Sequence, residues 1–177
     1  VRATAFFKSL SGQIMNVKNR KKFIIFDNGE TTRCKPISAQ DLSLFIVQCL
    51  DNIDNINKIL PIGGPGPAIT PLEMGQMLFK LTCKPEKFRK LPSKLFIFAG
   101  NTVRPFSKLS IKIKNLDEFL KTAHYYSTES MLVWDEQKHE YSAENTPEFG
   151  KDTLWEHYRK VLKEGIREHE LQSHKLF

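Results

Sequence analysis

The chain has 177 residues, 40% of them hydrophobic, which suffices for one compact domain with a substantial core. It contains no apolar run of the roughly 18 residues that a membrane-spanning helix requires. The net charge of +7 is uneven, because residues 1–36 and 80–121 hold eight and eleven Lys/Arg against two and three acidic residues. These stretches indicate either a surface for an anionic partner or ordinary solvated lysines, and the second interpretation is favoured.

The cysteines and histidines show no metal-site spacing. Cys34, Cys49 and Cys83 are widely separated and lie in apolar stretches, so we expect reduced thiols rather than a disulfide framework. His169 and His174 are five residues apart and would point roughly 140° away from each other on a helix, too far to share one zinc ion. We therefore predict no metal site.

The first part of the chain alternates between helical and extended patterns. Asn28-Gly29 is a strong signal for a tight turn, and Ser38 resembles a helix cap three residues before an acidic residue. In chain order, we predict a helix over 6–17, a strand over 23–26, its antiparallel partner over 31–37, a helix over 38–50 and a buried strand over 59–62.

The second part of the chain is dominated by helical patterns. Thr70 and Glu73 have the spacing of a capping box, with Pro71 at the first helical position. Further helices are predicted over 95–103, 116–123 and 154–162, and no strand pair is evident among them. We therefore expect this part to form a mostly helical lobe.

A glycine-rich loop connects the predicted strand at 59–62 to the helix that follows. Gly63, Gly64 and Gly66 suggest a phosphate-binding loop, but Pro65 and Pro67 supply no N–H groups between and after them. The spacing also matches neither the dinucleotide nor the Walker pattern, and no Lys-Ser/Thr pair follows. A turn whose glycines adopt unusual φ angles is therefore predicted instead.

Motifs for nucleophilic catalysis are missing, since the chain has neither G-x-S-x-G nor the Tyr-x-x-x-Lys pair of reductases. Tyr125, Tyr126 and Met131 either line a site for a flat aromatic ligand or pack a helix end on the core, and the second is favoured. Phe7 and Lys8 follow an expected strand end, which is where doubly wound α/β folds bind ligands.

Several segments, taken in order, carry a family resemblance. They resemble the C-terminal half of the NADPH-dependent divinyl chlorophyllide a 8-vinyl-reductases, in the atypical short-chain dehydrogenase/reductase group near the NmrA-like proteins. Ala3 replaces a proline of that family, so the turn is less restrained. The segments are Arg2-Ala-Thr-Ala-Phe-Phe-Lys-Ser-Leu10, Lys35-Pro-Ile-Ser38 with Asp41-Leu42, Leu60-Pro-Ile-Gly-Gly-Pro-Gly66 with Thr70-Pro-Leu-Glu73, Tyr125-Tyr126 with Glu129-Ser-Met131, Glu140-Tyr-Ser142, Gly150-Lys-Asp-Thr-Leu154 and Glu164-Gly165.

The resemblance implies an α/β fold: the C-terminal part of a Rossmann-type NAD(P)-binding fold with a mostly helical substrate lobe. Residues 1–62 would supply strands and helices of the NAD(P)-binding fold, and residues 63–177 the substrate lobe with the last helix. It also implies that the chain is a fragment of a longer enzyme. The Gly-rich dinucleotide loop, and catalytic residues that we do not identify, would lie in an N-terminal half.

The implied reaction is the reduction by NADPH of the 8-vinyl group of divinyl chlorophyllide or protochlorophyllide to ethyl, in chloroplast chlorophyll biosynthesis. The implied partner is the tetrapyrrole, with peripheral association with thylakoid or envelope membranes and no nucleic acid. Four aromatic or thioether side chains would stack on the macrocycle, and one of two lysines would pair with its propionate. The implied nicotinamide-side residues are Arg2, Ala3, Thr4, Ala5 and Phe6, and the substrate-side residues are Phe7, Lys8, Lys35, Tyr125, Tyr126 and Met131.

Two other interpretations stay open. The chain can belong to another atypical short-chain or NmrA-like reductase, or to an NADP-binding sensor with a different ligand or protein partner. A basic nucleic-acid-binding module is a more remote alternative. The basic run from Lys18 to Lys22 has only Phe23 as a neighbouring aromatic residue and no known nucleic-acid-binding motif, which disfavours it.

Overall fold

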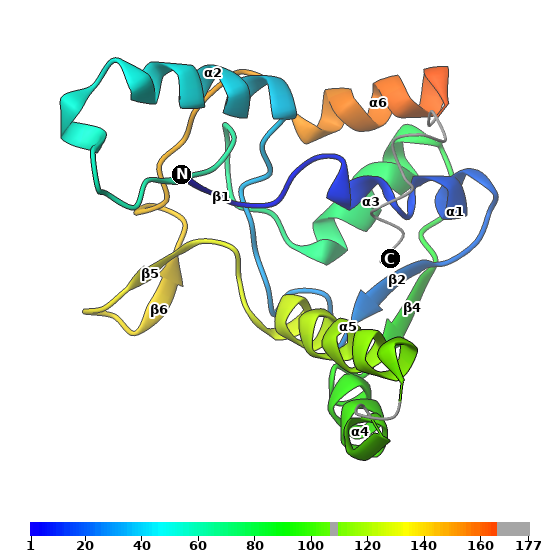
Figure 1. Ribbon diagram of the computed structural model, residues 1–177. Coiled ribbons are helices and arrows are strands. Elements are labelled where there is room, and N and C mark those ends of the chain that lie inside the picture. The colour runs from blue at the N-terminus through cyan, green and yellow to red at the C-terminus, as the bar shows by residue number, and fades with distance from the viewer. Residues whose placement is uncertain (107–109, 166–177) are drawn as a thin grey trace.

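The computed structural model describes residues 1–106 and 110–165 and mixes helices with short strands, which confirms the α/β class (Figure 1). The elements are β1 (Arg2–Ala3), η1 (Ser9–Ser11), α1 (Ile14–Lys18), β2 (Phe23–Phe26), α2 (Ala39–Leu50), η2 (Ile53–Asn55), β3 (Pro61–Ile62), α3 (Pro71–Leu81), β4 (Phe88–Leu91), α4 (Lys94–Val103), η3 (Arg104–Phe106), α5 (Ile111–Thr128), β5 (Val133–Asp135), β6 (Glu140–Ser142) and α6 (Leu154–Glu164). Those labelled η are single 3₁₀ turns.

The strands of the described residues form three separate pairs. β1 and β3 are parallel, with Arg2 opposite Pro61, and β2 and β4 are parallel, with Phe23 opposite Phe88. β5 and β6 are antiparallel and adjacent in sequence. Parallel pairing requires a long connection, and here the β1–β3 connection contains α1, β2 and α2.

The predicted hairpin around Asn28-Gly29 is wrong. The turn is present, with Gly29 at φ +78°, but β2 pairs with β4 rather than with residues 31–37. Phe88 of β4 packs its ring edge-on against Phe23 and against Phe79 of α3. This aromatic packing stabilises the pairing of β2 with the distant strand β4. A turn motif in the sequence carries no information about such a contact.

Two other predictions need correction. The helix expected over 6–17 exists only as η1 and α1, because Phe7 still donates its N–H to the carbonyl of Ile37 in an extended bridge. The second half is less purely helical than predicted, since it contains β4, β5 and β6. β5 and β6 are three residues each, joined through a turn in which Asp135 accepts two backbone N–H bonds. Strands this short carry almost no periodic signal.

Helix positions that depend on local capping are confirmed. Thr70 and Glu73 form the predicted capping box of α3, and the Ser38 hydroxyl accepts from the Asp41 N–H at the start of α2. α6 begins in the same way, with Thr153 accepting from Glu156 N–H. These bonds satisfy donors that the first turn of any helix leaves unpaired.

One main core and a smaller cluster hold the elements together. The smaller cluster surrounds Ile37, Leu42 and Ile62. The main core draws on both predicted domains, because Ala5 and Phe7 lie in it with residues of α3 and α6; the boundary at residue 62 stays a prediction. The main core comprises Ala5, Phe7, Ile14, Val17, Phe23, Ile25, Cys34, Met74, Leu78, Phe79, Leu154 and Tyr158.

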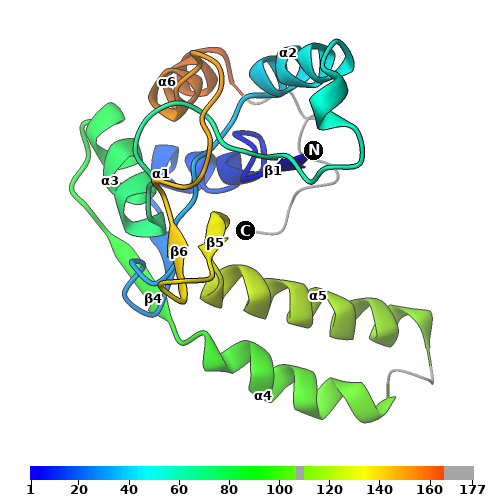
Figure 2. The same cartoon turned by 90° about the vertical axis from the view of Figure 1, so that its left-hand side faces the viewer.

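A helical hairpin of α4, η3 and α5 lies at one end of the molecule, where its members pack mainly on one another (Figure 2). α5 lies between the body and α4, so α4 is the outermost element in both views. No described helix combines the length and apolar character needed to span a bilayer. His169 and His174 lie outside the described residues.

Candidate functional site

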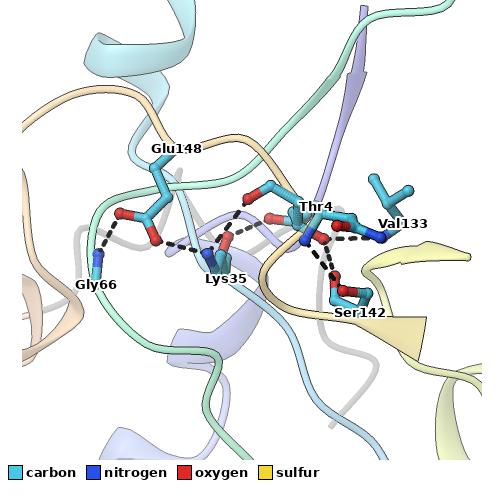
Figure 3. Close-up of polar contacts among 8 residues, drawn as sticks. Thr4, Lys35, Gly66, Val133, Ser142 and Glu148 are labelled. Carbon is cyan, nitrogen blue, oxygen red and sulfur yellow. Dashed lines mark hydrogen bonds and ion pairs between the residues drawn. The ribbon is translucent and has the colours of Figure 1, made fainter. Parts of the chain in front are cut away.

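A buried lysine marks the carboxyl ends of β1 and β3 (Figure 3). Lys35 is 5% exposed, and its Nζ lies 2.5 Å from Glu148 Oε1 and 3.3 Å from the carbonyl oxygen of Thr146. The Thr4 hydroxyl, just past β1, donates to the carbonyl of Lys35. An ammonium removed from water needs such partners, because burial of an unpaired charge is costly.

Extended backbone brings these side chains together. Residues 34–37 are extended and form isolated β-bridges with two other segments. Cys34 pairs with Ile69, and Ile37 pairs with Phe6. On the far side of β3, Gly63 donates to the Pro147 carbonyl at 2.8 Å and accepts from Phe149 N–H at 2.9 Å. This pairing lays residues 146–149 beside the end of β3 and carries Glu148 to Lys35.

The glycine-rich loop is a turn, as predicted, but for a partly different reason. Only Gly66 has a positive φ, at +93°, whereas Gly63 and Gly64 are needed for close contact. A Cβ would lie 2.6 Å from Lys35 Cβ at Gly63 and 1.9 Å from the Pro36 carbonyl oxygen at Gly64. The expectation of unusual φ at all three glycines is therefore wrong for the first two.

The N–H groups of this loop are already used. Gly63 donates to Pro147 O, Gly64 to Lys35 O, and Gly66 to Glu148 Oε2 at 3.2 Å. A phosphate-binding loop needs such donors to converge on the ligand, and here each of them bonds to the protein.

The carboxylate of Glu148 is stabilised in its charged form by its hydrogen-bond partners. The hydrogen bond from Lys35 is the main cause, and the Gly66 N–H and the positive charge of Lys35 add to it; together they hold the pKa of Glu148 below its usual value. The Lys35–Glu148 pair is therefore an ion pair at neutral pH.

A buried carboxylate, that of Asp41, was missed by sequence reasoning. Asp41 is 2% exposed, and its Oδ2 accepts from the N–H groups of Lys151 and Asp152 at 3.1 and 2.9 Å. Ser38 donates its hydroxyl to Asp152 Oδ2 at 2.7 Å. Asp41 thus joins the start of α2 to residues 150–152 instead of completing a capping box. The available signal was that both segments belong to the ordered set that resembles the reductase family.

The predicted nicotinamide-side segment is exposed at its two ends and buried in its middle. Arg2 and Phe6 are exposed, Ala3 packs on the smaller cluster, and Thr4 and Ala5 are buried. Arg2 and Phe6 are therefore the members of this segment that are most open to solvent.

Phe7 and Lys8, both predicted to contact substrate, differ in their exposure to solvent. Phe7 lies in the main core, with its ring centroid 5.3 Å from that of His157. Lys8 points to solvent at the start of η1.

The remaining predicted substrate residues lie around the end of α5. Tyr125 and Tyr126 are the most exposed aromatic residues of that end, with rings 5.6 Å apart in an edge-on arrangement. Met131 follows them and donates its N–H to Arg33 O at 2.9 Å, which places it beside Cys34. The structure therefore brings Met131, Lys35 and Thr4 to adjoining segments. The binding roles of these residues remain predictions.

Tyr141 extends this aromatic region through its contact with Glu129, and Tyr141 was not predicted as a site residue. The Tyr141 hydroxyl donates to Glu129 Oε2 at 2.6 Å, and this bond, with desolvation, raises the pKa of Tyr141 to about 12. Its ring packs edge-on against the half-exposed Trp134 at 5.0 Å. Exposed rings with a protonated phenol suit a large, flat, mainly apolar ligand.

Comparison with known proteins gives one consistent result. No family model matches the chain. Three curated relatives, each named "Divinyl chlorophyllide a 8-vinyl-reductase, chloroplastic", come from Arabidopsis thaliana, Zea mays and Cucumis sativus. They are 46%, 45% and 45% identical over 97%, 100% and 100% of this chain. The chain spans only 41%, 44% and 42% of their respective lengths.

The close contact between Gly150 and Asp41 predicts that Gly150→Ala lowers the free energy of unfolding substantially. Gly150 has φ +95°, and a Cβ there would lie 2.1 Å from Asp41 Cγ. Gly66 has φ +93° but open space around it, so Gly66→Ala is the matched control. We expect Gly66→Ala to lose about 1–2 kcal/mol of unfolding free energy, and Gly150→Ala about 1–3 kcal/mol more. Urea denaturation measures both, and equal losses would contradict the close packing.

The Lys35–Glu148 pair predicts an acid-dependent contribution to stability. The pKa of Glu148 is lowered in the folded state, so its contribution is complete above the ordinary value of 4.5 and is lost as pH falls through the folded pKa. Wild type should therefore exceed Glu148→Gln in stability at pH 7, and the gap should close in acid. Unfolding curves at both pH values test this, with the exposed Glu140→Gln as control. A gap independent of pH would exclude the ion pair as its cause.

Proposed function

Because the chain belongs by sequence to the family of divinyl chlorophyllide a 8-vinyl-reductases, we propose that it is part of an NADPH-dependent enzyme that reduces the 8-vinyl group of divinyl chlorophyllide or protochlorophyllide to ethyl. The observation that carries the proposal is similarity along the whole chain to relatives that bear this name. Their names are also the basis for proposing a chloroplast location.

In this reaction NADPH supplies a hydride to the vinyl group, a proton adds to the neighbouring carbon, and NADP⁺ is released. The vinyl group is conjugated with the macrocycle, so negative charge that develops there spreads over the ring. The main task of the protein is then to hold nicotinamide and vinyl group about 3–3.5 Å apart in a fixed orientation.

The chain fits one end of the cofactor better than the other. The N–H groups of its glycine-rich loop are bound internally, so this loop does not suit the dinucleotide phosphates. We assign the phosphates to the remainder of the longer protein, together with the catalytic residues. The segment from Arg2 to Phe6, leading out of β1 at its carboxyl end, is our candidate for the nicotinamide side.

We further propose that the remainder completes a Rossmann-type sheet beyond β1. Arg2 and Thr4 donate their N–H groups to the carbonyls of Leu60 and Ile62, so the polar groups of Ala3 face the opposite edge. Near that edge, α2 exposes Leu44, Val47 and Leu50, the last at 80%. A continued sheet with its covering helices would bury this surface, with residues 1–62 in the NAD(P)-binding fold and 63–177 as the substrate lobe.

For the substrate, we propose that Tyr125, Tyr126 and Met131 contact the macrocycle. Lys8 is the better candidate for pairing with the propionate, because its ammonium is exposed. Lys35 would have to exchange its present partner, Glu148, for the ligand. The ring of Phe7 would act from the core, by supporting the backbone that presents Lys8.

The direct test is turnover by the full-length protein. With NADPH and divinyl chlorophyllide, we expect the main absorption band to shift to shorter wavelength as conjugation is lost, and the product mass to increase by two hydrogens. Binding of NADPH without turnover would favour another reductase or a sensor. Salt-dependent binding of random nucleic acid, without turnover, would favour the basic binding module.

The exposed lysine at the start of η1 gives a specific prediction. Lys8→Ala in the full-length enzyme should raise the KM for the tetrapyrrole about three- to tenfold, as expected for a partly screened charge pair. Its kcat should change little. Lys22→Ala removes another exposed lysine, outside the proposed site, and serves as control. Steady-state kinetics measure both variants, and an unchanged KM for Lys8→Ala would remove the carboxylate-pairing role.

A further inference from the structure

The β5–β6 ribbon presents two aromatic rings beside the C-terminal end of α5 (Figure 2). Trp134 and Tyr141 are opposite each other in the antiparallel register, so their side chains lie on the same face of the ribbon. Their ring centroids are 5.0 Å apart in an edge-on arrangement, and Trp134 remains 42% exposed. We call these two rings the aromatic wall.

A carboxylate at the end of α5 holds one ring of the aromatic wall in place. Glu129 directly follows α5, and its backbone N–H donates to the carbonyl of Tyr125 at 2.9 Å. Its side chain accepts the hydrogen bond from the Tyr141 hydroxyl at 2.6 Å. This bond and desolvation raise the pKa of Tyr141, and Tyr125 is near enough to add a smaller electrostatic contribution. The aromatic wall therefore continues the exposed aromatic surface that Tyr125 and Tyr126 begin.

The base of the ribbon is attached to the segment proposed for the nicotinamide side. The buried Thr146 accepts from the N–H of Val133 in β5 at 2.9 Å and donates to the carbonyl of Ser142 in β6 at 2.7 Å (Figure 3). The carbonyl of Thr146 in turn accepts from Lys35, whose own carbonyl accepts from the Thr4 hydroxyl. Only two residues thus connect the ribbon to Thr4, which places the ribbon at the proposed active site rather than on a remote surface.

Packing within the ribbon explains only part of this arrangement. A cross-strand aromatic pair stabilises a short antiparallel ribbon. The bonds of Thr146 already fix the ends of both strands, whereas the indole ring of Trp134 keeps much of its surface in water. Exposed aromatic area of this kind beside a site indicates a surface that a ligand covers.

Charge limits how a ligand can lie on this surface. Residues 129–148 contain six acidic residues and one lysine. Glu136, Glu140 and Glu144 are exposed on or beside the ribbon. A carboxylate brought close to them would be repelled. An anionic ligand therefore turns an uncharged part towards the aromatic wall.

We propose that Trp134 and Tyr141 contact the tetrapyrrole, with an uncharged edge of the macrocycle against their rings and the propionate directed away from the ribbon. Glu129 is a positioning residue, because it holds Tyr141 without touching the ligand. Tyr141 is not the proton donor of the reaction, since ionisation of its phenol would place a second negative charge beside Glu129. The inference rests on the proposed function for the identity of the ligand, but the aromatic wall itself does not depend on it.

The test is binding of divinyl chlorophyllide to the full-length protein in the presence of NADP⁺, which prevents turnover. We expect Trp134→Ala to raise the Kd about tenfold, as for the loss of one stacked aromatic ring. Trp134→Phe keeps a ring and should raise the Kd less than about threefold. Phe98→Ala removes an exposed ring of α4 and should leave the Kd within about twofold of wild type. Absorbance titration measures all three, and an unchanged Kd for Trp134→Ala would overturn the proposal.

Steady-state kinetics with NADPH separate ligand contact from a purely structural role. Trp134→Ala should raise the KM for the tetrapyrrole with little change in kcat, because the contact is made equally before and during hydride transfer. A damaged fold would instead lower the active fraction, and with it the apparent kcat, at an unchanged KM. That second pattern would assign Trp134 to the stability of the ribbon and contradict the proposal.

Three changes test the positioning role of Glu129. Tyr141→Phe and Glu129→Ala each remove the bond between the two side chains and should raise the Kd about two- to fivefold. Glu129→Gln keeps an acceptor oxygen for the Tyr141 hydroxyl and should bind within about twofold of wild type. Equal losses in Glu129→Gln and Glu129→Ala would show that Glu129 does not act by holding the phenol.

The methyl ester of the substrate tests the orientation. Esterification removes the charge of the propionate but leaves the macrocycle intact, so Trp134→Ala should weaken the binding of acid and ester by the same factor. If the effect of Trp134→Ala disappears with the ester, the ring lies at the carboxylate end and the proposed orientation is wrong.

The outcomes for wild type distinguish this inference from the proposed function. Turnover of divinyl chlorophyllide, with a Kd that neither Trp134→Ala nor Tyr141→Phe changes, would support the reductase and refute the aromatic wall. Tetrapyrrole binding that depends on Trp134, without any turnover, would support the aromatic wall and refute the reductase assignment. Absence of tetrapyrrole binding would refute both.

Discussion

The buried ammonium of Lys35 is the constraint on which the arrangement of this chain most depends. A charge with so little solvent contact requires a carboxylate, and the one that it has, Glu148, is 113 positions away in sequence. Glu148 reaches Lys35 because residues 146–149 pair with Gly63 at the end of β3. The pairing in turn requires glycine at positions 63 and 64, where any side chain would strike residues 35 and 36. One charge thus fixes the paths of three segments.

Asp41, six residues after Lys35, is a second buried charged residue whose hydrogen bonds join distant segments. Its carboxylate satisfies two backbone N–H groups just before α6, and Gly150 passes so close that no side chain fits. The two carboxylates therefore hold residues 146–152 against both β3 and the start of α2. From there α6 enters the core, where Tyr158 is fully buried and donates its hydroxyl to Leu10 O. The placement of the last helix is a consequence of these polar contacts as much as of apolar packing.

Whether an element of this structure can be predicted from the sequence depends on how far apart in the sequence its interacting residues lie. The starts of α2 and α3 depend on bonds across three residues, so Ser38, Thr70 and Glu73 could be identified directly. The β2–β4 pairing joins residues 65 positions apart, and the strand Phe88–Leu91 contains two basic residues that hide its character.

The residues of the candidate site also fall into those that the sequence indicated and those that it did not. The ordered family motifs pointed to Thr4, Lys35 and Met131, which lie on adjoining segments. Glu148, Asp41 and the Tyr141–Glu129 pair were missed because their partners are defined only by the fold. Lys35 itself could be read from sequence only as a cation, whereas its burial against a carboxylate changes which ligands it can take.

The basic stretch of the second half changes its meaning once its positions in space are known. In the sequence, lysines at 87–121 are what an ordinary solvated surface would show. In the structure Lys94, Lys112 and Lys114 are exposed on the same projecting hairpin as several exposed apolar residues. The exposed apolar residues of α2 and η2 have a different setting, since Asp51 and Asp54 accompany them and Lys58 is the nearby cation of that loop. Two apolar surfaces with such different charge call for different occupants. The α2 surface, with acidic residues beside it, suits another part of a polypeptide.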